Sequence, residues 1–410
     1  MPAQTSALAG LSVVDFTWVG VGPLLTKYLA DFGAEVIRIE SRTHLDSFRY
    51  TPPFVDGTPD IERSGHFLNL NTSKAHVTLN LNHPQGLELA RRLIAKADVV
   101  AENFTSHVME QWSLTYEELR RLKPDLVMIS LSMEGRTGPH RDAPGFGTVL
   151  QAAAGLAHLT GWPDRPPAIP GVAYTDWTTP FFGLVALLAA LDYRRRTGEG
   201  QYIDVSNLEV GVNCLETAIL DYTVNGRIQR RAGNEWMVGD LPGAAPYGVY
   251  RCQGVNRWCA IAVGNDQEWR RFCDTLGHPA WTQEPCFTTV LGRVKHRDAL
   301  HALVETWTSQ YPAEDIMIRL QAAGIAAGVV QSAADLASDP QLVYRGNSVC
   351  LDHPEVGEQR YDTPAFQLSA SPAQLRPVPT LGQHNAYVFK EILGLSDAEY
   401  EAFAYDGVFD

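Results

Sequence analysis

One carboxylate in the sequence, Asp176, has the chemistry and the surroundings of a covalent nucleophile. It lies in the segment 174–180 (YTDWTTP), directly ahead of the apolar run 181–191. A carboxylate at the start of an apolar helix lies near the positive end of the helix dipole and near unpaired backbone N–H groups, so we expect Asp176 to be ionised at neutral pH. An ionised carboxylate can attack an activated acyl group.

The alternative role for Asp176 is that of a helix N-cap, which is a common position for Asp. Pro180 is favoured at the first position of a helix, and this makes Thr179 the more natural cap. The sequence therefore predicts a helix that begins at Pro180, with Asp176 ahead of it and without a local structural role.

The sequence contains no complete motif for a dinucleotide-binding site or for the common hydrolase sites. The segment Gly20-Val21-Gly22-Pro23 follows a predicted strand, but Leu25 stands where the dinucleotide-binding fingerprint has its third glycine, and Pro23 lacks a backbone N–H. We therefore expect no NAD and no flavin. Neither Gly-x-Ser-x-Gly nor His-Glu-x-x-His occurs, so hydrolase chemistry of those kinds has no motif behind it.

The composition argues against several partners and sites. The 410 residues include 33 basic and 47 acidic side chains, with a formal net charge of −14, whereas nucleic-acid binding needs a concentrated basic face. The six cysteines are scattered without a Cys-x-x-Cys pair or a Cys/His cluster, so we expect neither a metal nor a disulfide framework.

The hydropathy pattern predicts the cellular compartment of the protein. The N-terminal residues lack the basic and apolar regions of a signal peptide, and no apolar run reaches the ~18 residues needed to span a bilayer. We therefore expect a cytoplasmic protein that binds no membrane.

Alternating strands and helices must position Asp176. Residues 11–16 and 35–40 are strand-like, and a helix from Pro23 to Phe32 lies between them. The same alternation continues through strands at 77–81, 98–102 and 126–132 and helices at 84–97 and 116–122. The pattern predicts an α/β fold with a mostly parallel sheet and helices on both faces. Ligands would bind beyond the carboxyl ends of the strands, at the loops 17–22, 103–106 and 133–138.

Later segments predict a division into domains. After helices at 148–159 and 180–191 come a strand at 201–205 and a helix at 208–225. Residues 226–330 then read as a smaller α+β domain. The tail from Asp339 shows little periodicity and ends in a short helix at 386–393. The predicted parts are 1–225, 226–330 and 331–410.

Single residues near the predicted sheet edge remain ambiguous by themselves. Lys74 precedes a strand and is expected to be a solvated surface lysine. Asn103 could donate to a ligand carbonyl or phosphate, or form a turn. Phe146 and Trp112 could stack on an adenine, or belong to the core.

Motifs spread over nearly the whole chain carry a family resemblance. They are 11–17 (LSVVDFT), 33–40 (GAEVIRIE), Asn71-x-x-Lys74, 102–104 (ENF), 123–126 (KPDL), 138–139 and 144–146 (GP, PGF), 198–201 (GEGQ), 246–250 (PYGVY), 324–328 (GIAAG), 339–340 (DP) and 381–384 (LGQH). Their order and spacing resemble the class III CoA-transferase family, the formyl-CoA transferase type, which also contains α-methylacyl-CoA racemases.

The resemblance implies a fold and a reaction. The family fold is an interlocked dimer, in which each chain has a large Rossmann-like domain formed by both termini and a small middle domain. Asp176 falls on the family nucleophile, which attacks an acyl-CoA thioester to give an aspartyl anhydride. Returning CoA thiolate then makes an aspartyl-CoA thioester, which the acceptor acid attacks.

The resemblance also implies CoA contacts. The family glutamine near the acyl site is Gly20 here, and three basic family positions fall on Ser41, Gln111 and Asn82, so Arg38, Arg42 or Lys74 would have to supply the positive charge for the CoA phosphates. The positions that match the CoA contacts are Val19, Gly20, Val21, Leu79, Asn80, Leu81, Asn82, Asn103, Phe104, Pro144, Gly145 and Phe146.

Two other functions stay open. Racemases of this family use a His in a Gly-His-Asp segment, which falls on residues 145–147 here, and Phe146 cannot move a proton, so transfer is favoured. The chain could also be a non-catalytic CoA-binding subunit of a heteromeric transferase. Trp18, Trp177, Trp236 and Met237 could line an apolar acyl pocket.

Overall fold

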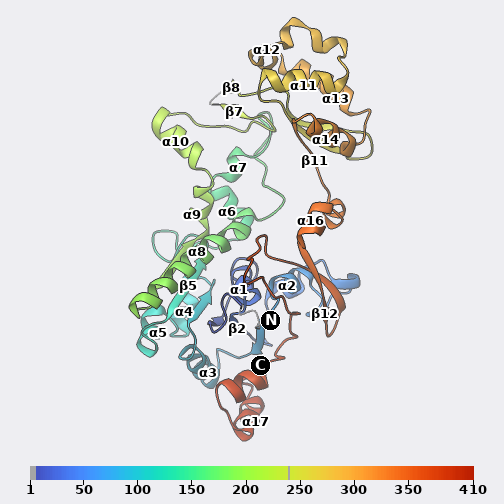
Figure 1. Cartoon of the computed structure of the whole chain (residues 1–410). Helices are drawn as coiled ribbons and strands as arrows, with labels where there is room; N and C mark the ends of the chain where they lie inside the picture. Colours follow the sequence, from blue (N-terminus) through green and yellow to red (C-terminus); the bar gives the residue numbers. More distant parts are fainter. Residues whose placement is uncertain (1–5, 239–240) are drawn as a thin grey trace. The chain divides into compact units, whose positions relative to one another are not determined.

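The chain folds into two compact units (Figure 1). A computed structural model describes residues 6–238 and 241–410. The first unit comprises Met1–Ala154, Gly171–Cys214 and Pro340–Asp410, and the second comprises Gly155–Pro170 and Leu215–Asp339.

A six-stranded parallel sheet organises the first unit, in the order β3-β2-β1-β4-β5-β6. Every residue of β4 and β5 is buried, as expected for parallel strands covered on both faces. The α/β fold predicted from the sequence is confirmed. The strands are β1 (Ser12–Asp15), β2 (Glu35–Glu40), β3 (Ala75–Thr78), β4 (Val99–Glu102), β5 (Val127–Ser132) and β6 (Tyr202–Ser206).

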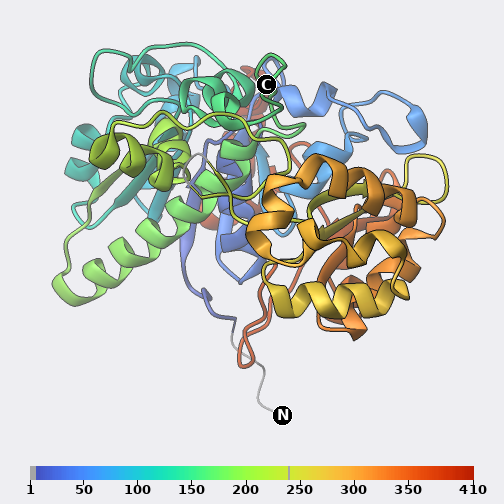
Figure 2. The ribbon, with the colours of Figure 1, turned by 90° about the horizontal axis from the view of Figure 1, so that it is seen from above.

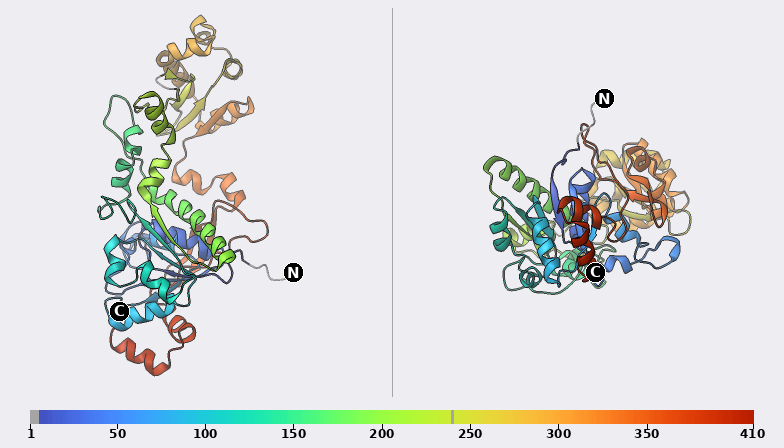
Figure 3. Two further views of the ribbon diagram at one scale, coloured as in Figure 1. Left: turned by 90° about the vertical axis from the view of Figure 1, so that its left-hand side faces the viewer. Right: turned by 90° about the horizontal axis from the view of Figure 1, so that it is seen from below.

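Helices cover both faces of this sheet. One face packs against α1 (Val21–Asp31), α8 (Tyr174–Thr197) and α9 (Asn207–Asn213). The other face packs against α3 (Pro84–Ile94), α4 (Ser106–Gln111), α5 (Tyr116–Leu122) and the C-terminal helices η5 (Tyr387–Ile392) and α17 (Asp397–Tyr405). Figure 3 shows α17, in red, beside the light-blue helices of this face.

Two predicted helices are each divided into two. The helix expected at 148–159 is α6 (Gly147–Ala153) and α7 (Leu156–Leu159), because Gly155 has φ of 87° and ends the first segment. The helix expected at 208–225 is α9 and α10 (Glu216–Asn225). In both cases the break coincides with the boundary between the two units, which helical periodicity does not reveal.

The second unit contains a three-stranded antiparallel sheet in the order β11-β10-β9. Figure 2 shows its helices, in gold and orange, around these strands. Its apolar core includes Tyr250, Ile261, Phe272, Leu300 and Ile316. The elements are β9 (Tyr247–Arg251), β10 (Trp258–Ala262), β11 (Ala326–Val329), α11 (Asp266–Leu276), α12 (Val290–Lys295), α13 (Arg297–Thr308), α14 (Ala313–Ala322) and α15 (Ala333–Ala337), with a short ribbon of β7 (Met237–Val238) and β8 (Leu241–Pro242).

The segment after residue 339 is more regular than the sequence predicts. It contains α16 (Pro340–Arg345) and a hairpin of β12 (Ser348–His353) and β13 (Gly357–Asp362). The expectation of little regular structure is wrong here, because β13 has few strand-forming residues and is stabilised by tertiary packing. Tyr361 is buried in a cluster with Phe67, Leu68 and Val378. The remaining elements of the first unit are α2 (Gly65–Leu70), η1 (Ser47–Tyr50) and η2 (Val55–Gly57).

The described ranges, 6–238 and 241–410, contain neither a membrane-spanning helix nor a cluster of metal-binding side chains. No helix in them is long and apolar enough to cross a membrane. No group of three or more His, Cys, Asp or Glu side chains in them is placed to hold a metal ion.

Gly86 allows α3 to approach the end of β3, and this contact predicts a stability effect. A Cβ at Gly86 would lie 2.1 Å from the backbone oxygen of Asn80. We expect Gly86→Ala to lower the free energy of unfolding by about 1–3 kcal/mol, despite a gain of about 1 kcal/mol in helix propensity. The measurement is urea unfolding, with the exposed neighbour Gln85→Ala as control; equal stability of G86A and the unsubstituted protein would contradict it.

Candidate active site

The site lies between β1 and β4, where the order of the strands across the sheet reverses. The chain adds β2 and β3 on one side of β1 and then β4, β5 and β6 on the other side. Ligands of open α/β sheets bind beyond the carboxyl ends of the strands at such a point. The two loops that follow these strands are joined reciprocally: the Trp18 N–H donates to Asn103 Oδ1 at 2.7 Å, and Asn103 Nδ2 donates to the Trp18 carbonyl at 2.8 Å. The side-chain amide of Asn103 therefore holds the two loops together.

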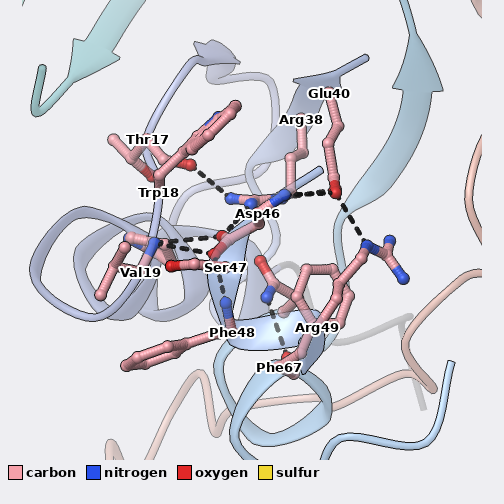
Figure 4. Close-up of polar contacts among 12 residues, drawn as sticks. Thr17, Trp18, Val19, Arg38, Glu40, Asp46, Ser47, Phe48, Arg49 and Phe67 are labelled. Carbon is pink, nitrogen blue, oxygen red and sulfur yellow. Dashed lines mark hydrogen bonds and ion pairs between the residues drawn. The ribbon is translucent and has the colours of Figure 1, made fainter. Parts of the chain in front are cut away.

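A buried ion pair holds the turn after β1 (Figure 4). Arg38 Nη1 donates to the Thr17 carbonyl at 2.6 Å, and Arg38 Nη2 lies 2.6 Å from Asp46 Oδ2. Asp46 also accepts the N–H of Val19 at 3.1 Å. Val19 has φ of 65°, an unfavourable value for a β-branched residue, so these contacts keep the turn in a strained conformation. Arg38 is fully buried in this role and does not face a ligand phosphate.

Lys74 is buried, so the predicted surface position is wrong. Its Nζ lies 3.1 Å from Asp15 Oδ2, 3.1 Å from the Pro23 carbonyl and 2.9 Å from Asn71 Oδ1. Burial lowers the pKa of Lys74 to about 8, against the opposing effect of Asp15. The three donors are engaged inside the fold, beneath α1. A role in holding a CoA phosphate does not fit this arrangement.

An aromatic cavity lies at the carboxyl ends of β1 to β4. Trp18 contacts the rings of His44 and Phe104 at centroid distances of 5.0 and 5.8 Å, and Phe104 contacts Trp112 at 5.5 Å. Arg42 is exposed nearby but is not part of its lining. The lining includes the predicted CoA positions Leu79, Asn80, Leu81, Asn82 and Phe104, together with Phe16, Trp18, Ile39, Glu40, Ser41, Thr43, His44 and Trp112.

A second cavity, of about 150 Å³, contains Asp176 and is called the Asp176 cavity below. Of the residues found in its lining, Asp176 alone has an ionisable side chain. Pro144, which directly precedes Gly145, does not line the cavity. The lining comprises the predicted positions Val19, Gly20, Val21, Asn103, Gly145 and Phe146, together with Leu131, Met133, Gly147, Leu150, Asp176 and Asn207.

Asp176 lies inside the first turn of α8, so the predicted start of this helix at Pro180 is wrong. The helix begins at Tyr174, its N-cap residue Ala173 makes no side-chain capping bond, and Pro180 stands inside the helix. A proline there cannot donate the N–H that would reach the carbonyl four residues earlier, which is that of Asp176. The apolar contacts of α8 with α1 and the sheet extend the helix through this position. The structure still assigns Asp176 no capping role.

The carboxyl group of Asp176 is largely removed from water. Burial raises its pKa to about 6, and no neighbouring charge opposes this shift. The group is still mainly ionised at pH 7, as the sequence predicts, but burial outweighs the helix dipole in setting the direction of the shift. The backbone of α6 comes very close: a Cβ at Gly147 would lie 2.5 Å from Asp176 Oδ2.

Three helices and one strand end hold the surroundings of Asp176. Gln151 of α6 donates through Nε2 to the Val172 carbonyl at 3.0 Å, just before α8 begins. The N–H of Leu208 in α9 donates to the Met133 carbonyl at 2.8 Å, after the end of β5. The wall of the Asp176 cavity is therefore built from α6, α8, α9 and the end of β5. The periodicity of the sequence predicts single elements and does not show that these four meet.

Trp18 and Trp177, two of the residues predicted for an apolar acyl pocket, do not line the Asp176 cavity. Trp18 lines the aromatic cavity, and Trp177 packs with Leu24 and Tyr28 in a separate cluster. Trp236 and Met237 belong to the second unit. The apolar wall beside Asp176 instead includes Leu131, Met133 and Leu150.

Sequence reasoning missed Leu131 and Asn207, and it named Met133 only as part of the loop 133–138. Both could have been identified from their positions at the carboxyl ends of β5 and β6, because the sequence predicts these two strands. Parallel strands bring such residues to one edge of the sheet.

Comparison with known proteins assigns the chain to a family. A family described as CoA-transferase family III matches residues 8–385. The chain is 34% identical to succinyl-CoA–D-citramalate CoA-transferase of Chloroflexus aurantiacus, over 92% of this chain and 91% of the relative. It is 31% identical to the beta subunit of succinyl-CoA–L-malate CoA-transferase of the same organism, over 96% of each chain.

A solved structure agrees with this assignment. A CAIB/BAIF family protein from Brucella suis is 32% identical and has a TM-score of 0.86, covering 95% of this chain and 100% of that one. The resemblance predicted from the sequence is confirmed.

The Arg38–Asp46 pair predicts a test of the turn. Asp46→Asn removes the closer of two charge partners from a buried guanidinium, since Glu40 Oε2 stays 3.8 Å from Arg38 Nε, and breaking a buried pair costs up to about 3–5 kcal/mol. We expect a lower free energy of unfolding and weaker acyl-CoA binding, measured by urea unfolding and calorimetry. The control is Asp56→Asn, because Asp56 is 82% exposed and pairs with Arg63 at 3.5 Å. Similar effects of the two substitutions would contradict the role of the buried pair.

The raised pKa of Asp176 predicts that its ionised form destabilises the fold. Between the unfolded pKa of 3.8 and the folded pKa of about 6, the folded state binds more protons, so stability falls as pH rises through this window. Above about pH 6 the cost is constant, at roughly 2–3 kcal/mol. We expect Asp176→Asn to be more stable than the unsubstituted protein at pH 7, by a margin that shrinks toward pH 4. Thermal unfolding at several pH values tests this, and a margin independent of pH would contradict it.

Proposed function

Because the chain belongs to CoA-transferase family III and is a CoA-transferase, we propose that it moves CoA from an acyl-CoA donor to a carboxylic acid acceptor through covalent intermediates on Asp176. The observation that carries the proposal is the carboxylate of Asp176 itself. Among the described residues it has no ion-pair partner, and it lies in a cavity at the carboxyl edge of the sheet. A poorly hydrated carboxylate of raised pKa is a stronger nucleophile than a solvated one.

The reaction balances without an external proton or electron. An oxygen of Asp176 attacks the thioester carbonyl, the carbon–sulfur bond breaks, and CoA leaves as the thiolate. The thiolate then attacks the aspartyl carbonyl of the resulting anhydride, which releases the donor acid and leaves an aspartyl-CoA thioester. The acceptor carboxylate repeats these steps in reverse. The apolar wall of Leu131, Met133 and Leu150 excludes the water that would hydrolyse the anhydride.

The two cavities suggest how CoA binds. Trp18 and Phe104 line the aromatic cavity, while their chain neighbours Val19 and Asn103 line the Asp176 cavity. We place the adenine against the aromatic side chains and the thioester beside Asp176, with the intervening chain along the Trp18–Asn103 contact. Arg42, exposed at the edge of the aromatic cavity, is the candidate for a phosphate contact.

The relatives suggest a donor. The two relatives compared above carry names of succinyl-CoA-dependent transferases. We propose a short acyl-CoA such as succinyl-CoA as donor and a second small carboxylic acid as acceptor, in the cytoplasm.

The exposed face of α8 supports an assembly. Phe182 is 47%, Val185 71% and Leu188 46% exposed, an unusually apolar surface for a helix in water. We propose that a second copy of the chain covers this face in an interlocked homodimer. A heteromer is the alternative, since one relative is a subunit of such an enzyme.

Racemisation of an acyl-CoA is the competing activity. It needs a second acid or base, and Phe146 occupies the position of the racemase His in the Asp176 cavity. An active racemase would exchange the α-proton of the substrate for deuterium without an acceptor acid, and we expect no such exchange.

Chemical trapping tests the proposed nucleophile. Succinyl-CoA followed by hydroxylamine should convert Asp176 to a hydroxamate, detectable by peptide mass analysis, while Asp176→Asn should be unlabelled and lose at least about 10³-fold in transfer rate. Transfer at an unchanged rate by Asp176→Asn would contradict its role as nucleophile, whereas binding of acyl-CoA without any transfer by the unsubstituted chain alone would favour a non-catalytic CoA-binding subunit.

The pKa of Asp176 predicts a pH profile for the same reaction. The protonated carboxyl group cannot attack, so the single-turnover rate of Asp176 acylation should fall about tenfold per pH unit below pH 6. A rate that stays constant between pH 7 and 5 would contradict this assignment.

A further inference from the structure

A second polar side chain, that of Asn207, opens onto the Asp176 cavity. Asn207 is the first residue of α9 and directly follows β6. It is only 4% exposed, and its Oδ1 has no hydrogen-bond partner among the described residues. Buried polar groups are normally hydrogen-bonded, so an unpartnered amide group beside a cavity is available to a group bound there.

The backbone around Asn207 is held firmly. Ser206 pairs with Ser132 across β6 and β5, and its Oγ accepts the N–H of Glu209 at 3.2 Å. The N–H of Leu208 donates to the Met133 carbonyl at 2.8 Å. The amide group is therefore presented to the cavity by a strand end and a helix start, which are rigid supports.

Other side-chain amides are not available for this role. Among the described lining residues the one other amide, that of Asn103, is bonded at both Oδ1 and Nδ2 by the backbone of Trp18, which fixes its orientation. Gly20, which also lines the cavity, has no side chain to offer. Asn207 is thus the described lining residue whose side-chain amide is not already held by a neighbouring loop.

We propose that the side-chain amide of Asn207 donates an N–H to the carbonyl oxygen of the acyl group while Asp176 attacks the carbonyl carbon. This inference rests on the proposed function. The oxygen becomes negatively charged as the tetrahedral intermediate forms, and the donor stabilises that charge. The amide can rotate to present Nδ2 without breaking a bond, because its Oδ1 is unpartnered.

A neutral donor suits this cavity. The attacking group is already an anion, and the new oxyanion forms next to it. A lysine or arginine at this place would stabilise the oxyanion but would also lower the pKa of Asp176 and weaken the nucleophile. An amide dipole stabilises the developing charge with a smaller effect on the ground-state carboxylate.

The test compares the rate of Asp176 acylation in two variants. Asn207→Leu keeps the approximate shape and removes the donor, and should slow single-turnover acylation by succinyl-CoA by about 10²–10³-fold with little change in CoA affinity. Asn207→Thr keeps a hydroxyl donor and should recover part of this loss. Asn213→Leu is the matched control on α9, since Asn213 is exposed and bonds only the Glu209 carbonyl.

The outcomes separate this inference from the proposed function. No hydroxylamine-sensitive adduct in the unsubstituted protein would overturn both. A normal adduct that forms in folded Asn207→Leu within about threefold of the normal rate would overturn only the role of Asn207. If Asn207→Leu unfolds, Asn207→Ala, which also removes the donor, decides: a loss in acylation rate together with a higher carbonyl stretching frequency of the bound thioester supports the contact, and an unchanged rate and frequency overturn it.

Discussion

The buried ion pair between Arg38 and Asp46 holds the turn on which both cavities depend. The turn 17–20 follows β1: its residue Trp18 lines the aromatic cavity, and Val19 and Gly20 line the Asp176 cavity. Val19 has a backbone conformation that its side chain disfavours. Arg38 bonds the Thr17 carbonyl and Asp46 bonds the Val19 N–H, so the pair fastens the turn on either side of Trp18. Asn103 ties the same turn to the loop after β4. Arg38 and Asp46 therefore fix the turn that lines both cavities, although neither side chain is part of either lining.

The Asp176 cavity shows the opposite use of electrostatics. Here a largely buried carboxylate has no counter-ion among the described residues, and burial raises its pKa to about 6. Such a group lowers the stability of the fold at neutral pH, and the same desolvation suits the proposed attack on a carbonyl carbon. The charged side chains Lys74, Arg38 and Asp15 are all paired beneath the sheet edge, away from this cavity. The structure therefore separates the charges that support the fold from the one proposed to react.

Much of the fold was predictable from the sequence, because β4 and β5 are short, mainly apolar runs, β2 alternates apolar and charged residues, and clear helix and turn signals bound β1 and these strands. The start of α8 was not, because Pro180 marks a helix start locally while tertiary contacts extend the helix to Tyr174. The burial of Lys74 was not predictable either, since its partner Asp15 lies 59 residues earlier and depends on pairing through the sheet. Asp176 was recognisable, but its desolvation and the neighbouring amide of Asn207 follow only from the packing of α6, α8 and α9.

In the proposed reaction, every turnover passes through an anhydride between Asp176 and an acyl group. An acceptor acid labelled with heavy oxygen in its carboxylate measures this directly, because its attack on the aspartyl-CoA thioester leaves one of its oxygens on Asp176. We expect the peptide containing Asp176 to gain the mass of heavy oxygen during turnover, and only when acyl-CoA is present. An active enzyme whose Asp176 peptide stays unlabelled after many turnovers would rule out the anhydride.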